Sequence, residues 1–473
     1  MNLSDQLNTP IFKTVSKAAD QLGLETYVIG GFVRDLILGR KETKDIDFVC
    51  LGSGIKLAYE VASLLDNQPK IQVFKNFGTA MLKAENLELE FVGARKESYR
   101  NNSRKPIVEN GSIDDDQKRR DFTINALAIQ LNKSNFGKLI DPFDGLKDIK
   151  EKKLVTPLDP DITYSDDPLR MMRAVRFACQ LNFEIEHHSL QAIKRNSERL
   201  KIVSQERITD ELNKIILCQK PSIGFKLLFD TKLLHQFFPK MVELSGVEII
   251  NNKGHKDNFL HTLEVLDNIS CKTSNLWLRW AAILHDIAKP DTKKFDDKQG
   301  WTFHGHEFLG SKIVPIIFRQ LKLPMNDKMK YVQKLVKLHL RPIVLAKDIV
   351  TDSAIRRLLY DAGKDIDDLM TLCDADITSK NYEKVQRYLA NFQIVRKKLK
   401  DVEQRDQIRN MKLPIDGDEI IQLFGIKPGK EIGILKKIVK DAILDGKIQN
   451  DKKQALKLIV DKGVEIGLKP IKK

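Results

Sequence analysis

The sequence has few cysteines, few aromatic residues and no long apolar run. Its five cysteines, at positions 50, 179, 218, 271 and 373, form no Cys-x-x-Cys pair, so we interpret them as buried thiols in a reducing compartment. No apolar stretch reaches the roughly 18 residues of a membrane span. Residues 1–14 lack the basic start and apolar core of a secretory signal. We therefore expect a cytoplasmic protein with no membrane partner.

Acidic residues are also fewer than basic residues. The chain carries 80 lysines and arginines against 65 acidic residues, a net charge of +15, and such a surplus attracts a polyanion. Aromatic residues make up only 7%, which disfavours a surface that stacks many unpaired bases. A structured RNA held through its phosphates fits better, and solvated surface lysines are the alternative. The length of 473 residues predicts about three domains.

The stretch 27–49 is the most informative part of the chain. An apolar run ends at Gly30 and Gly31, an apolar helical pattern follows, and a second strand contains Asp45 and Asp47. Alternation along a strand places both carboxylates on one face, with their stems about 6 to 7 Å apart. This spacing suits a pair of divalent metals that bind nucleotide phosphates. The glycines allow the backbone to approach those phosphates closely.

Downstream segments add further candidates. Residues 87–92 alternate strictly, which indicates a half-buried strand with Glu88 and Glu90 on one face; a solvated face is the alternative. Residues 96–118 are polar and without periodicity, and we expect a functional or mobile loop there. Arg119 and Arg120 then precede an apolar helix that carries an exposed Asn125. Arginine forks match phosphate oxygens, and an amide can meet sugar hydroxyls.

A second pattern favours base recognition. Asp167 and Arg170 are three residues apart at the start of a strongly helical stretch, and Arg173 follows at the same spacing. An adjacent carboxylate and guanidinium offer the acceptor and donors that the edges of cytosine and adenine require. Helix capping is the alternative role for Asp167.

Six of the nine histidines lie between positions 255 and 339, and an apolar helix ends in His285-Asp286. Imidazole with carboxylate suits a transition metal or magnesium ion that activates water for phosphoester hydrolysis. A packed core histidine is the alternative for each residue alone.

Together, GGFVRD, DID and RRDFTINA resemble the motifs of polymerase-beta-like nucleotidyltransferases, in the branch that holds bacterial CCA-adding enzymes and poly(A) polymerases. The resemblance implies that Asp45 and Asp47 bind Mg²⁺, with Glu90 assisting. It implies a nucleotide site of Gly30, Gly31, Arg34, Arg119, Arg120, Asp121, Asn125, Asp167, Arg170, Arg173 and Arg176. The family's flexible loop often carries an acid before Arg-x-Pro, where this chain has Asn101 and Asn102.

The histidine-rich segment resembles the HD phosphohydrolase superfamily. The resemblance maps metal ligands onto His261, His285, Asp286 and a late aspartate, Asp376 or alternatively Asp374. Residues His304 or His306, and His339, would serve a second metal or the phosphate. This implies a transition metal or Mg²⁺ at that site and a phosphatase or cyclic phosphodiesterase activity.

We therefore expect an α+β head with a mixed sheet, followed by all-α neck, HD and tail domains. The predicted divisions are 1–150 (nucleotidyltransferase head), 151–220 (neck), 221–394 (body with the HD domain) and 395–473 (basic tail). The predicted function is template-independent addition of CCA, or part of it, to the tRNA 3′ end with CTP and ATP. The neck and tail would hold the acceptor arm. The alternatives are a poly(A) polymerase, or a metal-dependent phosphohydrolase with a nucleotide- or RNA-binding head; the oligomeric state is open.

Overall fold

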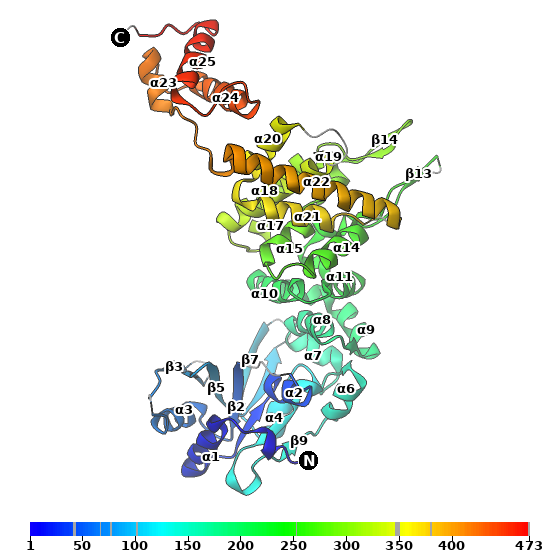
Figure 1. The fold of residues 1–473 in the computed structure, drawn as a ribbon. Coiled ribbons are helices and arrows are strands. Elements are labelled where there is room, and N and C mark those ends of the chain that lie inside the picture. Colours follow the sequence, from blue (N-terminus) through cyan, green and yellow to red (C-terminus); the bar gives the residue numbers. More distant parts are fainter. Residues whose placement is uncertain are drawn as a thin grey trace. The chain divides into compact units, whose positions relative to one another are not determined.

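The computed structural model describes residues 1–40, 44–66, 68–75, 78–100, 103–251, 253–345, 351–378 and 381–471. The chain forms two compact units, Met1–Val242 and Glu243–Lys473, which are described separately (Figure 1). Within the described ranges, no helix combines the length and apolar character that crossing a bilayer requires.

The first unit is built on a mixed seven-stranded sheet in the order β3-β4-β5-β2-β1-β8-β9. Its strands are β1 (Thr26–Ile29), β2 (Asp45–Cys50), β3 (Ile71–Phe74), β4 (Thr79–Ala84), β5 (Leu87–Gly93), β8 (Ala128–Gln130) and β9 (Leu139–Ile140). Only the β2–β5 pair is parallel among these neighbours. This sheet, with the helices that follow it, confirms the predicted α+β class.

Helices α1 (Pro10–Leu22), α2 (Gly31–Ile37) and α3 (Gly54–Ser63) pack on this sheet. Pro10 begins α1, and Gly23 ends it with φ +64°. Under α1, the ring of Phe48 stacks on Phe91 with centroids 4.9 Å apart and meets Phe12 edge-on at 6.2 Å. This aromatic core anchors β2 and β5, the two strands that carry the candidate carboxylates.

The expectation of a loop over residues 96–118 is wrong for the described part of that segment. Strands β6 (Arg95–Arg100) and β7 (Ser103–Asn110) form an antiparallel hairpin, and helix α4 (Ile113–Lys118) follows it. Backbone pairing between two polar strands needs no apolar periodicity, so the pattern carried no signal. A capping box between Ser112 and Asp115 begins α4. Asn101 and Asn102 lie outside the described residues.

The rest of the first unit is mostly helical. It contains α5 (Thr123–Ala126), α6 (Gly145–Glu151), α7 (Pro160–Asp166), α8 (Leu169–Leu181), α9 (His187–Asn196), α10 (Gln205–Ile216), α11 (Pro221–Asp230), α12 (Leu233–Phe237) and α13 (Pro239–Val242). Strands β10 (Lys153–Leu154) and β11 (Glu184–Ile185) form a short parallel pair beside α8.

The second unit is a helical assembly with two short hairpins. Its helices are α14 (Asn258–Ser270), α15 (Leu276–Leu284), α16 (Lys289–Thr292), α17 (His306–Gln320), α18 (Asp327–Leu338), α19 (Leu340–Leu345), α20 (Asp352–Ala362), α21 (Ile366–Ala375), α22 (Tyr382–Asp406), α23 (Gly417–Phe424), α24 (Lys430–Leu444) and α25 (Lys452–Glu465). Its hairpins are β12 (Ile249–Ile250) with β13 (Lys253–Gly254), and β14 (Lys294–Asp296) with β15 (Gly300–Thr302). These hairpins refine the all-α expectation.

All five cysteines are free thiols, as expected, and four of them are buried. Cys271 is the exception, because it ends α14 at the surface and is exposed. The prediction of a buried thiol is therefore wrong at this position.

Candidate active sites

The first candidate site begins at the turn between β1 and α2. Gly30 has φ +83°, and a Cβ added there would lie 3.0 Å from Nη1 of Arg120 and 3.5 Å from Oδ2 of Asp47. Gly31 begins α2 immediately afterwards. The backbone of this turn therefore lies directly against Asp47 and Arg120, which come from two distant segments of the chain.

Four carboxylates lie on the paired strands β2 and β5. The parallel register places Asp47 beside Glu90 and Asp45 beside Glu88. Burial raises the pKa of Asp47, and Asp45 adds to the rise; burial and the neighbouring Asp47 raise the pKa of Glu90. Glu88 is different, because it forms an ion pair with Lys83.

This carboxylate group fits a divalent cation. The raised pKa values mean that negative charge on Asp47 and Glu90 is incompletely compensated by the neighbouring arginines, and a cation would relieve it. Carboxylate oxygens are the ligands that Mg²⁺ prefers. Asp45 is exposed and Asp47 and Glu90 are half-buried, so the group is open to substrate.

The two arginines after α4 are fixed by a residue that sequence reasoning missed. Asp116 is fully buried and accepts from Nε of Arg119 at 3.0 Å and from Nε and Nη2 of Arg120 at 3.2 and 3.1 Å. Burial opposes ionisation of Asp116, but Arg120 and Arg119 outweigh it and lower its pKa. The sequence contains a pattern that could have predicted these contacts, since Asp116 precedes the two arginines by three and four residues on one helical turn.

Asn125 is buried, so the prediction of an exposed amide is wrong. Its Oδ1 accepts from Nη1 of Arg34 at 2.6 Å, and its Nδ2 donates to Oδ1 of Asp121 at 2.9 Å. Helix α5 is only one turn long, contacts α2 and α6, and is buried at all four positions, so its polar side chain turns inward. Asp121 also accepts from Nε of Arg173 at 2.7 Å. Burial would raise the pKa of Asp121, but Arg173 outweighs it and holds that pKa at about 2.

Helix α8 brings the predicted base-reading residues to the same network. Asp167 precedes Pro168, and its Oδ1 accepts from the amide of Leu169 at 3.3 Å, which is the capping contact. Arg170 donates to the carbonyl oxygen of Arg119. Arg176 pairs with Glu211 of α10 at 3.0 Å. The structure thus brings all the sequence-predicted head residues into one connected region of the first unit.

The second candidate site lies in the second unit, where five segments bring histidines and aspartates together. Nε2 of His261 lies 2.9 Å from Oδ1 of Asp376 and 3.4 Å from Oδ2 of Asp286. Nε2 of His285 lies 3.2 Å from that same Asp286 oxygen. On the other side, Nε2 of His306 lies 3.2 Å from Oδ1 of Asp286, and Nε2 of His339 lies 3.9 Å from it.

The tautomers of these imidazoles are set by the other ring nitrogen. Nδ1 of His285, His306 and His339 each donates to a backbone carbonyl at 2.7 Å, and Nδ1 of His261 contacts Oγ1 of Thr378 at 2.8 Å. For the three carbonyl-bound rings, the neutral form has its Nε2 lone pair directed at the cluster. Such fixed donors are typical of metal-ligating histidines.

The donor set fits a metal ion. Nε2 of His285 and Oδ2 of Asp286 are buried and lie 3.2 Å apart, in a geometry that forms no hydrogen bond between them. The two triplets that could each hold one ion share Asp286 and comprise His261, His285 and Asp286, and Asp286, His306 and His339. Burial would lower the pKa of His285, but Asp286 and Asp376 outweigh it and raise that pKa to about 10.

The alternatives left open by the sequence separate clearly in space. Asp374 faces away and pairs with Arg396, at 3.1 and 2.9 Å from its two guanidinium nitrogens. His304 is exposed and belongs to neither triplet. Sequence reasoning missed Lys289, whose Nζ lies 2.5 Å from Oδ2 of Asp286, although its i+3 spacing from that aspartate was visible.

Three domain families match consecutive parts of the chain. The Poly A polymerase head domain matches residues 26–155, the probable RNA and SrmB-binding site of polymerase A matches residues 182–244, and the HD domain matches residues 258–381. The four-part division predicted from the sequence stays a prediction.

Curated relatives extend the match. The A-adding tRNA nucleotidyltransferase of Deinococcus radiodurans is 30% identical over 71% of this chain and 76% of its own length. The CCA-adding enzyme of Levilactobacillus brevis is 28% identical over 96% of this chain and 98% of its own length. The A-adding tRNA nucleotidyltransferase of Aquifex aeolicus is 42% identical over 40% of this chain, and the match spans only 23% of that longer protein.

Solved structures share the fold. A CCA-adding enzyme in complex with ATP superposes with a TM-score of 0.64 at 24% identity, covering 98% of this chain and 99% of that one. The Thermotoga maritima CCA-adding enzyme complexed with tRNA superposes with a TM-score of 0.60 at 22% identity, covering 98% of both chains. With the ordered head, RNA-binding and HD matches, these relatives show that the chain belongs to the tRNA nucleotidyltransferase/poly(A) polymerase family and carries an HD domain.

Proposed function

We propose that this protein adds nucleotides, without a template, to the 3′ end of tRNA, and builds all or part of the terminal CCA from CTP and ATP. The observation that carries the proposal is the parallel register that sets Asp47 beside Glu90, at a glycine turn that also meets Arg120. The relatives named as A-adding and CCA-adding enzymes support it.

Asp45 and Asp47 would hold Mg²⁺, with Glu90 assisting from the neighbouring strand. When bound, Mg²⁺ supplies positive charge to the triphosphate and lowers the pKa of the attacking hydroxyl. The protein's part is to keep these carboxylates together despite their repulsion, which the buried aromatic contact between Phe48 and Phe91 on the same two strands accomplishes.

Arg34, Arg119 and Arg120 would neutralise the triphosphate. Asp116 holds the last two with defined orientation, so they meet a phosphate without first losing conformational freedom. We assign Asn125 a positioning role in place of ribose binding, since both ends of its amide are engaged by Arg34 and Asp121.

Asp167 and Arg170 would choose the base. Arg170 is bound to the carbonyl of Arg119, so the residue that reads the base edge and the residue that grips phosphate are joined by one hydrogen bond. Arg173 and Arg176 orient α8 through their ion pairs with Asp121 and Glu211. These pairs keep the base-selecting residues of α8 at a constant distance from the arginines that bind phosphate.

The tRNA would be held through its phosphates. Residues 395–473 contain 20 lysines and arginines against 12 acidic residues, a surplus suited to an acceptor arm recognised by shape and charge. Gly429 precedes α24, where free amides add a phosphate contact.

The test is addition to tRNA transcripts that lack CCA, CA or only A, with CTP and ATP offered singly and together. We expect ordered addition that stops at CCA, or a restriction to C or to A steps if the protein shares the task with a second enzyme. Long adenosine tails on arbitrary RNA would instead identify a poly(A) polymerase.

The histidine cluster supports a second activity, metal-dependent phosphoester hydrolysis. His261, His285, Asp286 and Asp376 would hold one ion, and His306 and His339 with Asp286 a second, of a divalent transition metal or Mg²⁺. Such ions supply a water of lowered pKa. Lys289, close to Asp286 and partly exposed, would meet a phosphate oxygen. The test is hydrolysis by the metal-loaded protein of p-nitrophenyl phosphate to p-nitrophenol and phosphate, or of 2′,3′-cyclic AMP to adenosine 2′- or 3′-monophosphate, and the loss of this hydrolysis in Asp286→Asn.

A further inference from the structure

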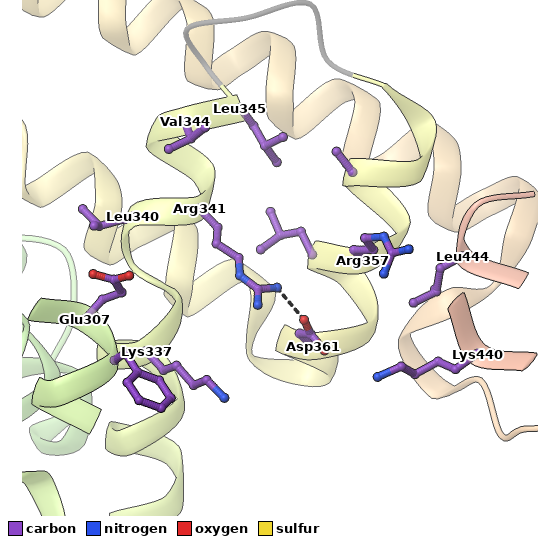
Figure 2. A pocket seen from close by; sticks show the side chains of 13 residues that line it. Glu307, Lys337, Leu340, Arg341, Val344, Leu345, Arg357, Asp361, Lys440 and Leu444 are labelled. Atoms are coloured by element: carbon purple, nitrogen blue, oxygen red, sulfur yellow. Dashed lines mark hydrogen bonds and ion pairs between the residues drawn. The ribbon is translucent and has the colours of Figure 1, made fainter. Parts of the chain in front are cut away.

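A cavity of about 640 Å³ lies in the second unit, lined by none of the candidate-site residues, although Glu307 and Leu340 in its lining directly follow His306 and His339 of the histidine cluster (Figure 2). It is enclosed by α17, α18, α19, α20 and α24. Ligand pockets for molecules of nucleotide size fall in this volume range.

One side of the cavity is apolar. Leu340, Val344 and Leu345 come from α19, and Leu358 and Leu444 from α20 and α24. Val344 is 54% exposed and Phe308, at the edge, is 52% exposed. Apolar surface of this kind, gathered inside a concavity, is suited to the flat body of a ligand.

The opposite side is cationic. Lys337 and Lys440 extend toward one another from α18 and α24, below the guanidinium of Arg341, and Arg357 completes the group (Figure 2). Arg341 is held by Asp361, and Arg357 by Asp441 and Asp445 at 2.8 Å each. Lys337 and Lys440 have no carboxylate partner in the described parts of the chain.

Charge counting indicates a phosphorylated ligand. The lining holds four cations, of which Arg341 is paired with Asp361, and Arg357 with Asp441 and Asp445. The two lysines, Lys337 and Lys440, are the lining cations without a carboxylate partner among the described residues. The ammonium groups of Lys337 and Lys440 and the fixed guanidinium of Arg341 would bind a ligand group that has two or more negative charges and several acceptor oxygens. A polyphosphate is such a group.

Glu307 adds a hydrogen-bonding requirement. Its Oε2 is buried and has no hydrogen-bond partner among the described residues. Nδ1 of the adjacent His306 lies 4.0 Å away and donates instead to the carbonyl of Phe303. A buried acceptor left unpaired is costly, so a ligand N–H group that reaches Glu307 would be stabilised there.

We propose that this cavity is a second nucleotide site, which binds a nucleoside polyphosphate whose base carries an exocyclic amino group. The base lies on the apolar side with its amino group toward Glu307, and the phosphates lie between Lys337, Lys440 and Arg341. The proposal does not depend on the activity of the head, but the head also takes ATP and CTP under the proposed function, so the experiment separates the two sites by location.

The experiment is photolabelling of the full-length protein with 8-azido-ATP in Mg²⁺, followed by peptide mapping. We expect label in the head and, separately, in peptides that cover residues 305–345, 354–361 or 440–444. The charge reversals Lys337→Glu and Lys440→Glu reduce labelling of the cavity at least about tenfold while the head stays labelled, because each removes a charge-assisted contact to phosphate. Lys437→Glu, an exposed lysine on α24 outside the cavity, is the matched control and leaves both labels unchanged.

Competition tests the recognition of the base. ATP and CTP displace the cavity label better than UTP does, and Glu307→Met abolishes that difference. The proposal is overturned if the head alone is labelled, if the charge reversals leave the cavity label unchanged, or if UTP or inorganic tripolyphosphate competes as well as ATP. Displacement by tRNA but not by ATP would also overturn it, in favour of an RNA surface.

Discussion

The head site and the histidine cluster hold polar groups in opposite ways. In the head, strand register sets Asp47 beside Glu90 in a half-open place, and their pKa values are raised. In the second unit, helix packing buries His285 and Asp286 completely, and backbone carbonyls fix the imidazoles. The difference indicates that the head takes its cation together with the triphosphate, while the cluster is preorganised to retain one.

Removing one carboxylate of the head site is the strongest test of the difference between the two sites. Asp47→Asn takes away a metal ligand and the charge that offsets Arg120, so we expect nucleotide incorporation to fall at least about a hundredfold. The measurement is addition of labelled nucleotide to a tRNA transcript without CCA. Phosphoester hydrolysis by the second unit should be unchanged; loss of both activities, or of neither, contradicts the assignment of two independent sites.

The next test concerns the aspartate that completes the histidine cluster. Asp376→Asn should weaken metal retention about 10- to 100-fold, because Asp376 contacts both His261 and His285. Metal content after dialysis, measured by mass spectrometry, is the readout.

Asp374→Asn is the matched control. It removes the same charge two residues away and breaks ion pairs with Arg396 and Lys272, neither of which belongs to the cluster, so metal content should not change. Equal losses in the two variants would contradict the placement of Asp376.

A smaller effect is expected from the carboxylate that holds the two arginines. Asp116→Asn leaves Arg119 and Arg120 without their buried partner, so we expect KM for CTP and ATP to rise about tenfold with a smaller change in kcat. Steady-state kinetics is the measurement. Asp115→Asn, which weakens the cap of α4 and not the arginine contacts, should lower stability slightly and leave KM unchanged.

The smallest effect is a pH dependence of stability in metal-free protein. The pKa of Asp47 is raised in the folded state, so its contribution to stability is fully present below the ordinary aspartate pKa and is lost as pH rises through the raised value. Asp47→Asn should therefore become progressively more stable relative to the parent protein as pH rises above the ordinary aspartate pKa.

Urea unfolding in EDTA at several pH values measures this difference. A constant difference for Asp47→Asn would show that the carboxyl is not perturbed in the folded state.

Local patterns predicted the elements but not all contacts. The alternation of residues 87–92 predicted a half-buried strand with Glu88 and Glu90 on one face, and β5 is found there. The place of Glu90 in the site and the fold class followed from the family resemblance. The hairpin of β6 and β7 was missed, because two polar strands that pair through their backbones show no apolar pattern. Asn125 was expected at the surface, since a short helical pattern does not reveal that the whole turn is buried.

By itself, the sequence determined which chemical groups are available and where the two candidate sites lie along the chain. These groups are a glycine turn with two aspartates, an arginine pair, an Asp-Arg pair suited to base selection, and a run of histidines. Only the tertiary structure decided which groups meet. It paired Asp47 with Glu90, seated both arginines on Asp116, separated Asp376 from Asp374 and joined α18 and α19 to α24 around a cationic cavity. The physical reason is that spacing along one helix or strand is fixed by local geometry, while the partner across the core is chosen by packing.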